Sequence, residues 1–179
     1  MKPLADYKDI HTHRKEFAAC GDCIVSVTPD DVLEVGGTYS VGIHPWDSGE
    51  PISLSQLKKL VEYARDPRVV AIGECGFDRL RGGSVDRQTA LFDFHAKLAK
   101  RVGKPLIIHS VRSDDLVLSA AKRHRPKTGE WIIHGFRGKP ERAKRLLEAG
   151  LSLSLGKNAD DALVQSIPPD RLYRESDEV

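Results

Sequence analysis

Seven side chains that can bind a metal ion follow short apolar stretches at several points of the sequence. Two histidines stand two apart in "DIHTH", and each of the runs "VVAIGE", "PLIIH" and "WIIH" closes on one potential ligand. Two carboxylates follow a last short run in "RESD". In chain order these residues are His11, His13, Glu74, His109, His134, Glu175 and Asp177. Because imidazole and carboxylate together suit Zn²⁺, Mn²⁺ and similar ions, the pattern predicts a divalent-metal site.

A single histidine at the end of a strand is more often a hydrogen-bonded structural residue than a ligand. The repetition favours metal binding, because independent accidents would not place ligands at the same point of successive strands. Side chains two apart in a strand point to one face, so His11 and His13 can act together. The ligands outnumber what one tetrahedral ion requires. Two metal ions, with Glu74 able to bridge them, fit the count better.

Eight short β-rich runs must position these groups, with helical stretches between several of them. The predicted strands are residues 8–13, 24–27, 39–43, 69–74, 106–109, 131–134, 151–155 and 172–174. The clearest predicted helices are residues 53–66, 86–104 and 140–150. Ser53 is placed as an N-cap, Gly103 as a C-cap and Pro140 in a first turn.

This alternation predicts an α/β protein with a parallel sheet that is buried on both faces. Eight units favour a (β/α)8 TIM-like barrel, with the carboxyl ends of the strands gathered on one functional face. With 179 residues the chain is short for this fold. The barrel is therefore expected to be shortened in its first third and to lack the final helix. An open doubly wound sheet is the alternative. We expect residues 1–179 to form a single domain.

The composition sets a few further limits. A formal net charge of +2 with 30% charged residues does not describe a polybasic nucleic-acid coat. No apolar run approaches the roughly 18 residues of a membrane span, and the first residues lack the apolar core of a signal peptide. The expected location is cytoplasmic, with no membrane partner. Cys20 and Cys23 in "CGDC" are expected to be two small buried thiols rather than a metal or redox pair.

Six motifs then carry a resemblance that spans nearly the whole chain. In order, "DIHTH", "SVGIHPW", "VVAIGECGFD", "KPLIIHSVR", "IIHGFRG" and "RESD" resemble the TatD-related metal-dependent hydrolases of the amidohydrolase superfamily. The resemblance implies a barrel that binds two divalent ions, such as Zn, Mn, Mg or Ni. The ligands that it implies are His11, His13, Glu74, His109, His134 and Asp177.

The chain departs from the family pattern at several positions. The family usually continues past the final aspartate with a loop and a helix, whereas this sequence stops at Val179, so a truncated form or a covering partner is expected. Ser176 replaces the usual threonine, and Arg174 occupies a position that is usually apolar. His95 stands where a helical glutamine is common and is expected to be structural.

The leading functional hypothesis is a DNA phosphodiesterase that trims single-stranded 3′ ends, as the resemblance implies. Glu74 and Asp177 would be catalytic, with Asp177 moving the proton of an activated water. His44, Arg112 and Arg137 are expected to hold phosphate, for which arginine offers a planar, two-pronged grip. The alternative for the arginines is that each caps a helix or pairs with a nearby acid, Asp114 or Glu141.

Two other functions stay open. The same centre could hydrolyse a small ester, amide or phosphate, or the barrel could be degenerate and bind without catalysis. Completeness of the ligand set argues against the degenerate barrel. The basic run at residues 122–127 is expected to be a solvated turn at the end of the barrel opposite the site.

Overall fold

The computed structural model describes residues 2–124 and 130–177 and contains one sheet of eight parallel strands, ordered as in the sequence. The strands are β1 (Asp9–Thr12), β2 (Cys23–Val27), β3 (Tyr39–Val41), β4 (Val69–Asp78), β5 (Leu106–Val111), β6 (Trp131–Ile133), β7 (Ser152–Leu155) and β8 (Leu172–Arg174). The backbone N–H of Ser176, just after β8, donates to Asp9 Oδ1 of β1 at 3.2 Å. The sheet edges therefore meet, and the expected (β/α)8 barrel is confirmed over the open doubly wound sheet.

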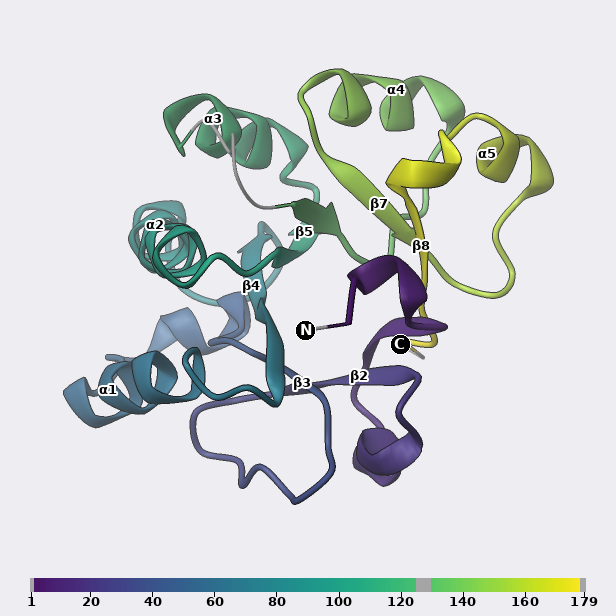
Figure 1. Cartoon of the computed structure of the whole chain (residues 1–179). Coiled ribbons are helices and arrows are strands. Elements are labelled where there is room, and N and C mark those ends of the chain that lie inside the picture. The colour runs from purple at the N-terminus through teal and green to yellow at the C-terminus, as the bar shows by residue number, and fades with distance from the viewer. Residues whose placement is uncertain (1, 125–129, 178–179) are drawn as a thin grey trace.

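In the part of the chain that the structure describes, five α-helices surround the ring of strands (Figure 1). They are α1 (Leu54–Tyr63), α2 (Val85–Val102), α3 (Asp114–His124), α4 (Pro140–Glu148) and α5 (Asp161–Gln165). The Ser53 side chain accepts from the backbone N–H of Gln56 to cap α1, and Gly103 ends α2 with a left-handed φ of 68°. The three expected helices are confirmed, while α3 and the short α5 come in addition to them. No helix among the described residues is both long and apolar enough to cross a membrane.

The connections between the first three strands of the barrel contain little helix. Only the 3-10 helix η2 (Lys15–Cys20) connects β1 to β2. The connection from β2 to β3 is a wide loop without a helix, drawn in indigo and blue in Figure 1. The 3-10 helix η3 (Pro45–Gly49) and α1 then follow β3. The expected shortening is thus confirmed.

Two strands continue past the ends predicted for them. β4 runs to Asp78 rather than stopping at Glu74, and β5 runs to Val111 rather than stopping at His109. The reason is mutual pairing, because residues 76–78 of β4 lie in register with residues 109–111 of β5. Glu74 and His109 therefore lie inside strands, and the expectation that both stand at strand ends is wrong.

The core has two parts, as a barrel inside a helical shell requires. One apolar cluster gathers inward-facing side chains from five strands, including Ile10, Ile24, Val70 and Ile132. The larger cluster lies between strands and helices, where the rings of Phe77 and Phe92 approach to 4.8 Å. Full burial of such side chains contributes about 1.5–3 kcal/mol each, so the barrel wall is stabilised from both faces.

The predictions for the cysteine pair and for the basic run need correction. Cys20 is exposed and Cys23 is half-buried, so the pair is not two buried thiols. Burial, with Cys20 beside it, raises the pKa of Cys23 to about 12, which disfavours the thiolate that a metal or a redox role requires. In the basic run, residues 122–124 form the last turn of α3 rather than a free turn, and residues 125–129 lie outside the described residues.

Candidate metal centre

Glu74 lies at the centre of a cluster of histidines. It is 5% exposed, and each of its two oxygens faces imidazole nitrogens from other strands or loops. Oε1 lies 2.8 Å from His109 Nδ1, 2.8 Å from His134 Nε2 and 2.9 Å from His44 Nε2. Oε2 lies 3.2 Å from His13 Nε2 and 3.3 Å from His11 Nε2. The barrel thus brings together side chains that are up to 123 positions apart in the sequence, from His11 to His134.

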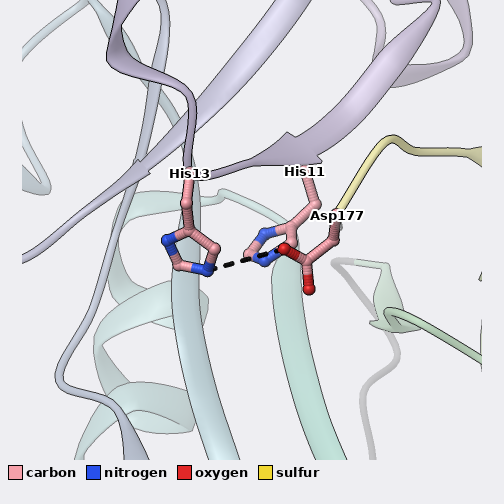
Figure 2. Close-up of side chains that lie close together, drawn as sticks. All are labelled: His11, His13 and Asp177. Carbon is pink, nitrogen blue, oxygen red and sulfur yellow. Dashed lines mark ion pairs between the residues drawn. The ribbon is translucent and has the colours of Figure 1, made fainter. Parts of the chain in front are cut away.

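The segment after β8 adds two carboxylates to this cluster. Asp177 Oδ1 lies 3.9 Å from His13 Nε2, and Figure 2 shows these two side chains beside His11. Asp177 Oδ2 lies 3.8 Å from His134 Nδ1. Glu175 is 4% exposed, and its Oε1 lies 3.7 Å from the same His134 nitrogen. All the metal ligands implied by the resemblance therefore lie in one cluster, and Glu175 joins them.

Burial and charge act in opposite directions on these groups. Burial alone would raise the pKa of the Glu74 carboxyl, but the neighbouring histidines, His134 first, hold it well below its usual value. Burial lowers the pKa of His11, which favours the neutral imidazole. An ionised carboxylate and a neutral imidazole are the forms that bind a divalent cation.

Several buried polar atoms have too few partners inside the protein. Neither ring nitrogen of His11 makes a hydrogen bond to any part of the described chain, and the same holds for His134 Nδ1 and Glu175 Oε2. Leaving such atoms unpaired costs about 1–3 kcal/mol each. Imidazole nitrogen and carboxylate oxygen are atom types that bind divalent cations, so such ions fit the residues that are present; the hydroxyls of Ser40 and Ser154 are also buried without a partner.

The described residues contain four groups of potential ligand atoms. Within each group the atoms lie within 4.8 Å of one another. The groups are His11, His13 and Asp177; His11, Glu74 and His134; His44, Glu74 and His109; and His134, Glu175 and Asp177. Glu74 is shared by two groups that differ in both histidines. His44, expected to contact substrate, lies among the potential ligands, and its role stays a prediction.

Asp78 is a site residue that the sequence interpretation missed. It is 3% exposed, and its Oδ2 lies 3.1 Å from His109 Nε2 and accepts from Trp46 Nε1 at 2.6 Å. His109 therefore stands between two carboxylates, with Nδ1 facing Glu74 and Nε2 facing Asp78. A carboxylate behind a ligating imidazole orients the ring and fixes the position of its proton. Asp78 lies four positions after Glu74 and shares its face only because β4 continues past the end predicted for it.

Two polar side chains of α2 hold the backbone around the site. Gln88 pairs with both backbone groups of Asp78, accepting from its N–H at 2.8 Å and donating to its carbonyl at 2.9 Å. The Nε2 of His95 accepts from the N–H of Ile43, next to His44, at 3.0 Å, while its Nδ1 donates to Leu91. Burial lowers the pKa of His95 to about 4, so it is neutral at pH 7. These contacts agree with the structural role expected for His95.

Both predicted arginines face a cavity of about 770 Å³ that opens over the cluster. Arg112 and Arg137 are exposed, and neither side chain makes a hydrogen bond or an ion pair to the part of the chain that the structure describes. Asp114, the alternative partner of Arg112, is held instead by two hydrogen bonds from Arg142, at 2.5 and 2.7 Å. The guanidinium groups are therefore available to an anion in the cavity.

Comparison with known proteins agrees with this geometry. The family model described as TatD related DNase matches residues 33–178. The chain belongs to the TatD-related DNase family. A relative named uncharacterized metal-dependent hydrolase YjjV, from Escherichia coli K12, is 33% identical over 167 residues, which cover 86% of this chain and 63% of the relative. A second, from Klebsiella pneumoniae, is named 3′-5′ ssDNA/RNA exonuclease TatD and is 31% identical, over 77% of this chain and 56% of its own length.

Solved structures of the TatD family show the same fold. The crystal structure of YjjV superposes with a TM-score of 0.69 at 24% identity and covers 97% of this chain and 80% of its own. A TatD-family hydrolase from Entamoeba histolytica gives 0.75 at 17% identity, with 96% and 73% covered. The chain spans 56–63% of the length of the two curated relatives.

Proposed function

We propose that this chain is a hydrolase that uses two divalent metal ions, one on each side of Glu74. The observation that carries the proposal is that the two oxygens of Glu74 face different histidines, Oε2 facing His11 and His13 and Oε1 facing His109 and His134. A bridging carboxylate between two sets of ligands is the arrangement expected for a two-metal hydrolytic centre. The proposed ligands are those implied by the family resemblance, namely His11, His13, Glu74, His109, His134 and Asp177.

Bound metal ions would lower the pKa of a coordinated water and offset the negative charge of the transition state. The protein's own part is to hold the reacting groups in place. Asp177 lies at the edge of the cavity, within 4 Å of both His13 and His134, and is proposed to accept the proton of the attacking water on a carboxylate oxygen. Glu74 would help to hold both ions, since it lies among the histidines on both sides of the cluster.

The cavity wall is suited to an anionic substrate. Arg112 and Arg137 have no partner within the described chain and are proposed to hold phosphate oxygens. His44 is proposed to donate to a substrate oxygen beside Glu74, since its side chain, at 18% exposed, is the more open of the two in the group with His109. We propose a phosphodiester of single-stranded nucleic acid, cut from the 3′ end, because relatives named as ssDNA/RNA exonucleases share this family.

A small phosphate or ester is the second candidate substrate. The cavity volume of about 770 Å³ lies within the range typical of small-ligand pockets. We further propose that residues 1–179 fold as one domain, since the ligands come from both ends of the described chain.

The test is cleavage of a single-stranded DNA oligomer, end-labelled on its 5′ side, with Mn²⁺ or Mg²⁺. The expected result is stepwise shortening by the wild-type protein and none by Glu74→Gln, with elemental analysis showing that the variant has lost bound metal. Asp66→Asn is a matched control, because Asp66 pairs with Arg68 just before β4 and not with the cluster. Failure of the wild-type protein to bind metal would overturn the metal centre. If it binds metal but does not shorten DNA, a panel of small phosphates and esters decides for the second candidate.

A further inference from the structure

Trp46 is an exposed aromatic residue on the wall of the cavity. It lies in η3, two positions after His44, and is 42% exposed. The other tryptophan, Trp131, is 5% exposed and lies in β6. What makes Trp46 informative is its place on the wall of the cavity, since ligand pockets are commonly lined by aromatic side chains.

The indole ring is held in a fixed orientation. Its Nε1 donates to Asp78 Oδ2 at 2.6 Å, and its backbone N–H donates to His44 Nδ1 at 3.2 Å. The guanidinium carbon of Arg81 lies 4.4 Å from the centre of the ring. A ring fixed in this way loses little conformational freedom when a ligand stacks on it. Arginine planes and tryptophan rings are both surfaces on which a nucleobase stacks.

The position of Trp46 relates this ring to the metal cluster. Its ring centre lies 4.6 Å from that of His44 and 6.0 Å from that of His109. Glu74 Oε1 is 2.8 Å from His109. A base stacked at Trp46 therefore belongs to the same nucleotide as the phosphate at the cluster, or to the nucleotide next to it.

We propose that Trp46 and Arg81 form a stacking site for the nucleobase at the end of the substrate strand. The proposal rests on the proposed nucleic-acid function and adds how the terminal nucleotide is held. Stacking accepts all bases, because every base has a π face. The site therefore favours single-stranded ends, whose bases are free to leave the stack, and not a particular sequence.

The test compares two ligands that differ only in the base, deoxyadenosine 5′-monophosphate and deoxyribose 5-phosphate, on the metal-loaded protein. Trp131 is buried, so a ligand cannot stack on it. A decrease in tryptophan fluorescence on ligand binding therefore reports on Trp46. We expect quenching by the nucleotide only. By calorimetry, Trp46→Ala should weaken nucleotide binding about 5- to 100-fold and leave binding of the sugar phosphate unchanged.

A second variant separates the ring from its hydrogen bond. Trp46→Phe loses the bond to Asp78 but keeps an aromatic face, so it should retain most of the base-dependent affinity. Leu80→Ala, an exposed apolar change in the neighbouring loop, is the matched control and should bind as the wild type does. Equal affinity of the wild type for the two ligands, or an equal loss of both in Trp46→Ala, would overturn the stacking site. So would a Trp46→Phe protein as weak as Trp46→Ala. Cleavage of DNA by the wild type is read separately, so retained cleavage with no stacking removes this inference alone.

Discussion

Changing Asp78 to asparagine replaces one acceptor oxygen by an NH₂ group in a carboxylate that receives hydrogen bonds from three N–H donors. Asp78 Oδ1 accepts from the backbone N–H groups of Leu80 and Arg81, at 2.7 and 3.2 Å. Oδ2 accepts from Trp46 at 2.6 Å and lies 3.1 Å from His109 Nε2. Asparagine has one acceptor atom, so its NH₂ group must face one of these two pairs of donors. If the amide oxygen stays on the backbone, the NH₂ group faces His109 and turns it away from Glu74.

The expected magnitude follows from what Asp78 does to a ligand. Removing the partner behind a metal-binding histidine typically weakens metal binding 10- to 100-fold, or about 1.4–2.7 kcal/mol. The loss should fall on the ion held by His109 and Glu74, so one equivalent of metal should weaken while the other is retained. Losing hydrogen bonds to a charged acceptor should also lower the free energy of unfolding by about 1.5–3 kcal/mol.

The assay is competition between the protein and a chromophoric chelator for Zn²⁺ or Mn²⁺, with the stoichiometry checked by elemental analysis. Circular dichroism and urea unfolding establish that Asp78→Asn is folded under the same conditions. Asp66→Asn is the control, because the Asp66 carboxylate also accepts several hydrogen bonds, all of them from Arg68. A folded Asp78→Asn protein with the affinity and stoichiometry of the wild type would refute the role assigned to Asp78.

Three further outcomes are expected from other parts of the molecule. Alanine at Arg112 or Arg137 should raise KM for an oligonucleotide by about tenfold with little change in kcat, which steady-state kinetics measures. His95→Ala leaves a buried backbone N–H near His44 without its acceptor, and should lower the free energy of unfolding in urea by about 1–3 kcal/mol or more. Burial would raise the pKa of Asp114, but Arg142 outweighs it and holds the pKa below the ordinary value. This contribution is therefore complete above about pH 4, the unfolded value, and is lost as the pH falls through the lowered native pKa. Asp114→Asn should lower the free energy of unfolding by about 1–2 kcal/mol at pH 7 and by progressively less as the pH falls below about 4.

The barrel and the residues that cluster at its centre could be predicted from the sequence, because both depend on local patterns. The apolar runs that end at His134 or contain His11 are recognisable in the sequence. Capping residues such as Ser53 indicate where a helix begins. Strand ends were less well predicted. β4 and β5 continue because each supplies the other with hydrogen-bonding partners, and such pairing between residues more than 30 positions apart leaves no local signal.

The contacts around each predicted ligand could largely not be predicted from the sequence. Asp78 looked like the last letter of a motif, and only the fold shows that its carboxylate stands behind His109. The burial of the cysteines was misjudged for a similar reason. Small apolar side chains are usually buried, but Cys20 is the last residue of the 3-10 helix η2 and is exposed there.

The glycines around Glu74 explain how one strand can carry a buried carboxylate so close to its neighbour. At Gly76, which has a φ of 150°, a Cβ atom would lie 2.0 Å from the carbonyl oxygen of His109. At Gly73, with a φ of 131°, it would lie 2.4 Å from that of Ile107. Only glycine therefore fits at these two positions of β4 beside β5. Between them, Glu74 meets His109 at 2.8 Å from inside two paired strands. In the motif "GECG", Glu74 thus lies between two glycines whose backbone conformation other residues rarely adopt, and this backbone brings the Glu74 carboxylate to His109.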